Sequence, residues 1–186
     1  MLVGPNGCGK TSLLDAAIGA RQLRSGRVWL KSERPVAYAV QDALSGLLPW
    51  LTVWDNLLLP SRLAAPDQAA EADGEAFLAA LGIASLRHAM PTRLSGGERQ
   101  MINLIRAACT PADLVMLDEP FGALHSGTRA LAIQEVMPRF EGRTMLVVSH
   151  EPADLQLGFD RYLLIRDDGV ADVSAEEALC FLEAST

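Results

Sequence analysis

A glycine-rich pattern near the amino end of the chain leaves few folds open. Residues 4–11 are Gly-Pro-Asn-Gly-Cys-Gly-Lys-Thr, which fits the P-loop or Walker A pattern G-x-x-x-x-G-K-[ST]. The pattern follows the apolar pair Leu2-Val3 and begins a stretch of helical periodicity over 11–20. Glycines let the backbone curl so that successive N–H groups face phosphate oxygens, and the following helix adds the positive end of its dipole. A chance match has a probability of about one in a hundred for a chain of this length.

The residues of this loop have distinct expected roles. We predict that Lys10 reaches the β- and γ-phosphates of a nucleotide and that Thr11 is a ligand of Mg²⁺. The residues expected to contact the nucleotide here are Gly4, Pro5, Asn6, Gly7, Cys8, Gly9, Lys10, Thr11 and Ser12.

Short apolar runs alternate with helix-period stretches along the chain, which predicts an α/β fold. Strands are expected over 28–30, 36–40, 114–117, 144–148 and 162–165, and helices over 11–20, 97–109 and 128–140. The runs contain few polar residues, as is typical of strands covered on both faces of a parallel sheet. We therefore expect a P-loop NTPase core with a mostly parallel sheet.

The middle of the chain breaks this alternation and predicts an inserted helical subdomain. Four prolines punctuate it, and an Ala-rich stretch over 67–81 has helical periodicity. Because glycine disfavours a helix interior by about 1 kcal/mol, we expect that helix to begin after Gly74. The expected division is a core formed by 1–42 and 106–186, with the helical subdomain over 43–105.

Two adjacent carboxylates end the apolar run 114–117. Asp118 and Glu119 are expected at the carboxyl end of a strand, where ligands of open α/β sheets bind. Asp118 is predicted to hold Mg²⁺, and Glu119 to polarise a water that attacks the γ-phosphate. Alone, the pair would more often be a solvated acidic turn, by about two to one. The P-loop in the same chain reverses those odds.

Composition excludes several function classes. The chain has 16 Lys and Arg against 23 Asp and Glu, a formal net charge of -7, so we expect no nucleic-acid partner. It has no apolar run of about 18 residues and begins with glycine-rich rather than leader-like sequence, so neither a membrane span nor a leader is expected. Cys8, Cys109 and Cys180 form no CxxC pair and predict neither a disulfide framework nor a zinc site.

A second phosphate-type element precedes the helix expected over 97–109. Residues 94–98 are Leu-Ser-Gly-Gly-Glu, with a hydroxyl and two glycines at a helix start. Together with the P-loop, this stretch resembles the LSGGQ signature of the ATP-binding subunit of ABC transporters, with Glu98 in place of Gln. The resemblance extends from Leu2 to about Ile165.

The resemblance implies further roles for residues at matching positions. Gln41 matches the glutamine that contacts Mg²⁺ and the attacking water, although an ordinary polar strand end is the alternative. His150 matches the histidine that contacts the γ-phosphate, and Ser95, Gly96 and Gly97 match the element that covers the nucleotide of a second copy. The implied protein binds ATP and Mg²⁺, forms a homodimer or pairs with another ATPase subunit, and drives transmembrane permease subunits. Its implied location is cytoplasmic, on the inner face of the cell membrane.

The sequence departs from the family in two places. Members carry a longer segment before the P-loop, with an aromatic residue that stacks on adenine, whereas here Gly4 follows Met1 almost directly. Losing such stacking, worth roughly 1–3 kcal/mol, predicts nucleotide affinity about ten- to a hundredfold weaker. A shortened sequence explains the gap equally well. His125 stands where the family has an Asp that organises contacts across the dimer, which predicts altered coupling between two sites.

The most specific resemblance lies after Gln41. Residues 47–53, Leu-Leu-Pro-Trp-Leu-Thr-Val, are similar to importers of nitrate, sulfonates and taurine, while the alternative is that Trp50 and Trp54 are core aromatics. The tail after Ile165 is too short for the regulatory domain of some importers. Two rival functions remain: a soluble ABC ATPase outside transport, and a degenerate subunit that hydrolyses weakly or not at all and serves as a structural partner.

Overall fold

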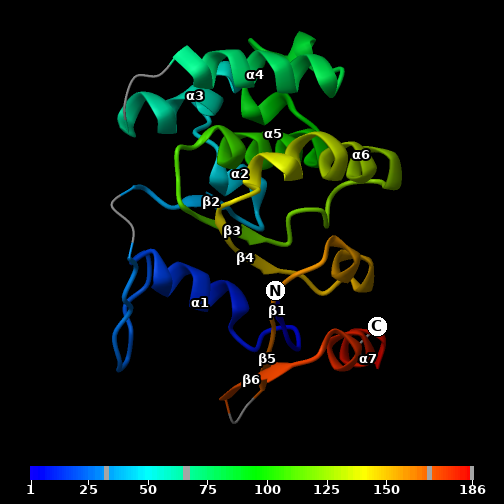
Figure 1. The fold of residues 1–186 in the computed structure, drawn as a ribbon. Helices are drawn as coiled ribbons and strands as arrows, with labels where there is room; N and C mark the ends of the chain where they lie inside the picture. Colours follow the sequence, from blue (N-terminus) through cyan, green and yellow to red (C-terminus); the bar gives the residue numbers. More distant parts are fainter. Residues whose placement is uncertain (32–33, 65–67, 167–168, 185–186) are drawn as a thin grey trace. The chain divides into compact units, whose positions relative to one another are not determined.

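A computed structural model describes residues 1–31, 34–64, 68–166 and 169–184. The chain forms two compact units (Figure 1). Unit 1 comprises Met1–Lys31 and Leu146–Thr186, and unit 2 comprises Ser32–Met145. The α/β fold class predicted from the sequence is confirmed in both units.

Unit 1 contains a sheet centred on a very short strand. Its strands are β1 (Leu2–Val3), β4 (Thr144–Val148, of which 146–148 belong to this unit), β5 (Tyr162–Arg166) and β6 (Gly169–Val173). β1 is parallel to both neighbours, with Leu2 opposite Val148 and opposite Leu163. β6 runs antiparallel to β5. The parallel strands bring the segments that follow β1 and β4 to the same edge of the sheet.

The helical elements of unit 1 are α1 (Lys10–Ala17), the 3₁₀ segment η5 (Pro152–Leu157) and α7 (Ala175–Ala184). η5 and α7 pack around a small apolar core on the sheet. The core consists of Met1, Val3, Tyr162, Leu164, Ala178 and Leu182. Ser174 and Glu177 start α7 with reciprocal hydrogen bonds, in which each backbone N–H donates to the other's side chain. The tail of the chain is therefore ordered against the sheet as far as the structure describes it.

Unit 2 combines two parallel strands with a layer of helices. β2 (Ala37–Ala39) pairs with β3 (Leu114–Asp118), with Ala37 opposite Val115 and Ala39 opposite Leu117. The helical elements are α2 (Ala43–Gly46), α3 (Val53–Ala64), α4 (Gln68–Ala80), η1 (Ala84–Leu86), η2 (Pro91–Arg93), α5 (Gly96–Cys109), α6 (Ser126–Leu131), η3 (Ala132–Val136) and η4 (Met137–Phe140). α5 is largely buried and contacts β2, α2, α3 and α4, so it forms the centre of this unit (Figure 1).

Most of the predicted elements are found, with shifted ends. The helix expected over 97–109 is α5, and the strands expected over 36–40, 114–117, 144–148 and 162–165 are β2 to β5. The helix expected over 128–140 begins two residues earlier, at Ser126, and passes into a π-helical turn and a 3₁₀ turn. α1 ends at Ala17 rather than at Ala20, because Gly19 adopts a φ of 79° that ends a right-handed helix.

Two predictions about local structure are wrong. Residues 28–30 form no strand: no described strand pairs with them, and Trp29 is 83% exposed. The helix expected to begin after Gly74 includes it, since α4 already starts at Gln68. A Cβ on Gly74 would lie 3.1 Å from the ring of Trp54, so this glycine permits close helix packing that offsets its low helical propensity. Asp67, in the same prediction, lies outside the described residues.

The tryptophans and cysteines have different surroundings. Trp50 is exposed and is no core aromatic, whereas Trp54 is partly buried under the guanidinium of Arg87, 3.7 Å from its ring centre. Cys109 is buried, and this burial raises the pKa of its thiol to about 12, so the thiol is unreactive at neutral pH.

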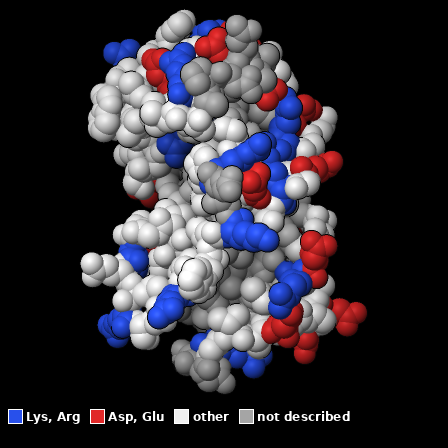
Figure 2. All heavy atoms as spheres, turned by 60° about the vertical axis from the view of Figure 1, so that its left-hand side comes forward, with Lys and Arg blue, Asp and Glu red and all other residues white. Residues whose placement is uncertain are grey.

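The surface carries charges of both signs. On the face drawn in Figure 2, Lys and Arg side chains lie beside Asp and Glu side chains over much of the surface. Ion pairs join Arg62 to Asp55, Arg87 to Glu75, Arg139 to Asp73, and Arg161 to Asp172. No helix within the described ranges is long and apolar enough to cross a membrane.

Candidate functional site

The glycine-rich loop of unit 1 is curled as the sequence predicts. Gly7 and Gly9 have φ values of 78° and 101°, in the left-handed region that favours glycine. At Gly4, a Cβ would lie 2.9 Å from the sulfur of Cys8 and 3.0 Å from the backbone oxygen of Ile165. A side chain at Gly4 would therefore push the loop off β5, and glycine is required for packing there.

The ammonium group of Lys10 lies against the backbone of this loop. The side chain is only 7% exposed, and Nζ donates hydrogen bonds to the backbone oxygens of Gly4, at 2.9 Å, and Pro5, at 3.0 Å. Gly9, which has no side chain, is the N-cap of α1, so the first N–H groups of that helix face the loop without a capping side chain. Ammonium and helix end together make the loop a fitting cradle for an anion.

Thr11 and Ser12 are partly buried in the first turn of α1. The hydroxyl of Ser12 accepts a hydrogen bond from the guanidinium of Arg21. Arg21 thereby adds a second positive charge to the first turn of α1, a contribution that the sequence analysis did not identify.

His150 lies at the same edge of unit 1 as the loop. Because Leu2 is opposite Val148, the residues two positions further on, Gly4 and His150, leave the sheet at the same level. The His150 side chain is 47% exposed, and its Nε2 lies 3.5 Å from a carboxylate oxygen of Glu151.

Two neighbours hold the turn that carries His150. The hydroxyl of Ser149 donates to the buried carboxylate of Asp154 at 2.5 Å and accepts from the backbone N–H of Glu151 at 3.0 Å. Ser149 and Asp154 were not predicted from the sequence as supports of this turn. The signal was available: a serine follows an apolar strand directly, and serine side chains commonly accept from a backbone N–H two residues further on.

In unit 2, Asp118 and Glu119 lie at the carboxyl end of β3. Both are buried, at 0% and 8% exposed, which contradicts the alternative of a solvated acidic turn. Glu119 has a φ of 49° and is the only non-glycine among the described residues with positive φ. Such a conformation costs about 1–2 kcal/mol, and the surrounding structure must stabilise it.

Gln100 provides part of that support. This side chain is 1% exposed, and its amide donates to the backbone oxygens of Glu119, at 3.2 Å, and Pro120, at 3.0 Å. Gln100 lies in α5, one turn after Ser95. Gln100 thus links α5, the helix that begins at the 94–98 stretch, by hydrogen bonds to the turn that carries the two carboxylates.

Gln41 is exposed and comes two residues after β2 ends. Continuing the register of β2 and β3 places Gln41 at the level of Glu119, at the same edge of the strand pair. The buried amide of Asn103 donates to the backbone oxygen of Val40 at 2.9 Å and fixes the strand end before Gln41.

Asn103 and Gln100 are functional neighbours that the sequence analysis did not single out. They lie three residues apart, and so on the same face, of an otherwise apolar helical pattern. Buried amides at that spacing indicate hydrogen bonds to backbone groups elsewhere in the fold.

Ser95 is the N-cap of α5 and explains why Glu98 fits this family position. The backbone N–H of Glu98 donates to Oγ of Ser95 at 3.3 Å, and the backbone N–H of Ser95 donates to the Glu98 carboxylate at 2.7 Å. Two hydrogen bonds from Ser95 lower the pKa of the Glu98 carboxylate. The bond from the backbone has the larger effect and the bond from the side chain the smaller one.

Gly96 and Gly97 differ in their surroundings. Nothing lies within 4 Å of a Cβ placed on Gly96, whereas a Cβ on Gly97 would lie 3.2 Å from the backbone oxygen of Ala123. The signature therefore packs against the segment that leads to His125. Ser95, Gly97, Glu98 and His125 line one cavity of about 280 Å³.

His125 caps the next helix. Its Nδ1 accepts from the backbone N–H of Thr128 at 3.3 Å, and its Nε2 lies 2.7 Å from the Thr128 hydroxyl. This is the capping role that an Asp commonly plays, so the substitution keeps the start of α6 intact.

Comparison with known proteins adds a family assignment to this geometry. Residues 1–122 match the family described as ABC transporter. Among curated proteins, the chain is 38% identical over 181 residues to the aliphatic sulfonates import ATP-binding protein SsuB 1 of Streptomyces avermitilis, covering 96% of this chain and 66% of the relative. It is 39% identical to the protein of the same name in Paracoccus denitrificans, covering 92% and 69% respectively.

A thiamine import ATP-binding protein, ThiQ of a Ruegeria species, is 34% identical over 180 residues, covering 89% of this chain and 76% of the relative. The chain spans 66% and 60% of the length of two sulfonate-import relatives, from Streptomyces avermitilis and Pseudomonas syringae.

Solved structures agree on the fold. The ATP-binding subunit of an ABC transporter superimposes with a TM-score of 0.81 at 19% identity, covering 98% of this chain and 86% of that one. An inward-facing metal-chelate type ABC transporter gives a TM-score of 0.72 at 23% identity, covering 99% and 78%.

Proposed function

The chain belongs to the ABC transporter family, and on this basis we propose that it is the ATP-hydrolysing subunit of a small-molecule importer. The single observation that carries the proposal is the position of Lys10. Its buried ammonium is held against the backbone of a loop whose glycines adopt the left-handed conformation. A buried cation beside an uncapped helix start suits the phosphates of a nucleotide.

In unit 1 we assign phosphate binding to the loop and to α1. Residues 4–9 offer backbone N–H groups, Lys10 binds the β- and γ-phosphates, and Thr11 is a ligand of Mg²⁺. Ser12 contacts a phosphate next to Arg21. His150 contacts the γ-phosphate from the turn that Ser149 and Asp154 hold.

In unit 2 we assign Mg²⁺ binding and activation of the attacking water to residues at the end of β3. Mg²⁺, when bound, neutralises charge on the phosphates and orients them; Asp118 and Gln41 are the groups of this unit that would hold it. A buried carboxylate is the donor type that Mg²⁺ prefers, so Asp118 fits the ion. Glu119 accepts a proton from the water that attacks the γ-phosphorus, and its fixed turn keeps the carboxylate oriented.

Ser95, Gly96 and Gly97 are assigned to the nucleotide bound by a second copy of the chain. The Ser95 hydroxyl lies at the start of α5, where its oxygen accepts from the backbone N–H of Glu98, and we assign it to contact the γ-phosphate of that nucleotide. In this proposal two chains pair head to tail, so a lone chain hydrolyses slowly. We retain residues 43–105 as the helical subdomain that presents this signature.

The partners proposed are a second ATPase subunit and transmembrane permease subunits, with the chain on the inner face of the cell membrane. Support comes from relatives that are named as import ATP-binding proteins for aliphatic sulfonates and for thiamine. The alternative, a subunit that hydrolyses weakly and acts mainly as a structural partner, is favoured by one observation: a histidine occupies the position of the dimer-organising Asp.

Lys10→Ala tests the proposal. We expect it to abolish ATP binding measured by calorimetry, while Lys31→Ala, which removes the other lysine at an exposed position, binds ATP as the parent does. Equal ATP binding by Lys10→Ala and the parent would refute the proposal. Turnover separates the alternatives: hydrolysis that Glu119→Gln abolishes identifies an ATPase, and parent turnover no higher than that of Glu119→Gln identifies the structural partner.

The dimer is tested by dilution. Turnover per chain is expected to fall as the protein concentration is lowered, because each nucleotide needs the signature of a second copy. Constant turnover per chain would exclude the head-to-tail pairing.

A further inference from the structure

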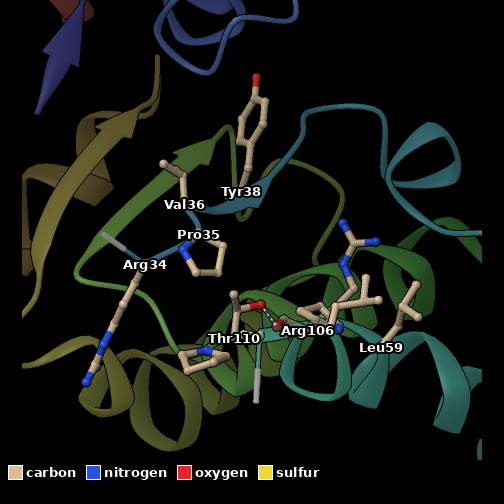
Figure 3. Close-up of a pocket in the computed structure, with 11 residues that line it drawn as sticks. Arg34, Pro35, Val36, Tyr38, Leu59, Arg106 and Thr110 are labelled. Carbon is tan, nitrogen blue, oxygen red and sulfur yellow. Dashed lines mark hydrogen bonds between the residues drawn. The ribbon is translucent and has the colours of Figure 1, made fainter. Parts of the chain in front are cut away.

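Unit 2 contains a large cavity that none of the assigned roles uses. Its volume is about 900 Å³, within the range of small-molecule sites. It is lined by the segment at the start of β2, by the second half of α3 and by the end of α5 (Figure 3). Gln41 and Asp118 lie at the opposite, carboxyl ends of their strands. The cavity is therefore separate from the group of functional residues in this unit.

Arg106 is the unusual residue of this cavity. Its side chain is mostly buried, and burial lowers the pKa of the guanidinium. The structure shows neither a carboxylate nor a hydrogen-bond acceptor for this guanidinium among the described residues. By contrast, Arg34, which lines the same cavity, pairs with Asp113 at 3.5 Å. A mostly buried guanidinium that no described carboxylate pairs favours an anionic ligand in the cavity that it lines.

The rest of the cavity wall near Arg106 is apolar. Arg106 and Leu59 project side by side from the packed helices α5 and α3, whereas Arg34 points away at the other end of the cavity (Figure 3). Leu63 and Val36 add apolar surface, and the hydroxyl of Thr110 is occupied because it donates to the backbone oxygen of Arg106 at 2.8 Å. A ligand beside Arg106 therefore meets one guanidinium and the aliphatic side chains of Leu59 and Leu63, whereas Arg34 and Tyr38 line other parts of the cavity.

We propose that this cavity binds a small organic anion, an aliphatic sulfonate or carboxylate whose head group pairs with Arg106 and whose chain packs on Leu59 and Leu63. A guanidinium forms paired hydrogen bonds with the oxygens of such a head group. The choice of ligand follows from charge complementarity. The guanidinium of Arg106, which no described carboxylate pairs, favours one anionic group, and the two leucines favour an aliphatic rather than a polar body. The proposal does not depend on ATP hydrolysis.

The experiment is a calorimetric titration of the full chain, without nucleotide, with butanesulfonate, butanoate and the neutral 1-butanol. We expect the two anions to saturate one site and 1-butanol to bind at least about tenfold more weakly, equivalent to 1.4 kcal/mol. Arg106→Met is expected to weaken anion binding at least about tenfold, and Arg106→Lys to weaken it less. Arg34→Met is the matched control and is expected to leave the affinity unchanged.

Stability distinguishes a ligand site from a structural arginine. Because Arg106→Met removes a buried charge that no described carboxylate pairs, its urea midpoint is expected to equal or exceed that of the parent. Four results would overturn the proposal: no saturable anion binding up to about 10 mM, equal binding of butanesulfonate and 1-butanol, anion binding that persists in Arg106→Met, or binding that only Arg34→Met abolishes. Because nucleotide is absent throughout, none of these results bears on the ATPase assignment.

Discussion

The side-chain amide of Gln100 donates a hydrogen bond to the backbone oxygen of Glu119 at 3.2 Å. This contact joins the helix that begins with the signature to the turn that carries the proposed base. Since Glu119 is the one described non-glycine residue with positive φ, the contact falls where the backbone needs external support. The two functional segments of unit 2 are therefore mechanically linked.

Gln100→Leu is expected to destabilise the protein by about 1–3 kcal/mol, because the backbone oxygen of Pro120 loses its donor and that of Glu119 keeps only the N–H of Gly122. Urea unfolding measures the change. Gln134→Leu is the control, as that side chain is exposed. Equal midpoints for the two variants would show that the amide does not support the turn.

Replacing Glu119 by glycine or by alanine distinguishes the backbone strain at this position from the role of its carboxylate in hydrolysis. Both Glu119→Gly and Glu119→Ala remove the carboxylate, so both are expected to lose ATP turnover. Because the φ of 49° suits glycine, Glu119→Gly is expected to be more stable than Glu119→Ala by about 1 kcal/mol. The comparison uses urea unfolding, and an alanine variant at least as stable as the glycine variant would contradict the strained turn.

The capping box at Ser95 predicts a specific pH dependence. Hydrogen bonds from Ser95 lower the pKa of Glu98 below its ordinary value of 4.5, so their stabilisation is present above that value and is lost as the pH falls below it. Glu98→Gln keeps an oxygen acceptor but cannot titrate. Its urea midpoint is therefore expected to fall less steeply than that of the parent between about pH 5 and pH 3.

Glu141→Gln, at an exposed turn position, is the control for this titration and is expected to follow the parent. If the Glu98→Gln and parent midpoints fall in parallel as the pH is lowered, the carboxylate does not stabilise the helix start.

His125 is expected to affect stability and turnover differently. His125→Ala removes the acceptor for the backbone N–H of Thr128 and should cost about 0.5–2 kcal/mol in thermal or urea unfolding. His125→Asp keeps a capping oxygen and should be at least as stable as the parent. If the histidine impairs coupling between two paired chains, His125→Asp also raises ATP turnover, and unchanged turnover would exclude that effect.

Local patterns predicted the parts of the site that depend on local backbone geometry. The loop at Gly7 and Gly9 was predictable because only glycine favours the φ values that curl the chain there. Asp118 and Glu119 were predictable because an apolar run of strand length must end at a sheet edge. Residues 28–30 show the limit: they have strand composition, but strand formation needs a neighbour, and no described strand pairs with them.

The sequence by itself determined the curled glycine-rich loop, the α/β class, the position of the two carboxylates and the family, since each depends on residue types in local patterns. Only the tertiary structure decided which atoms support them. Gln100 reaches the backbone of a residue 19 positions away, and Asn103 that of a residue 63 positions away. That Arg106 lines a cavity, with no carboxylate partner among the described residues, likewise becomes evident only from the packing of two helices and a strand. Partners of buried polar groups come from segments distant in sequence, and no local pattern encodes which segments those are.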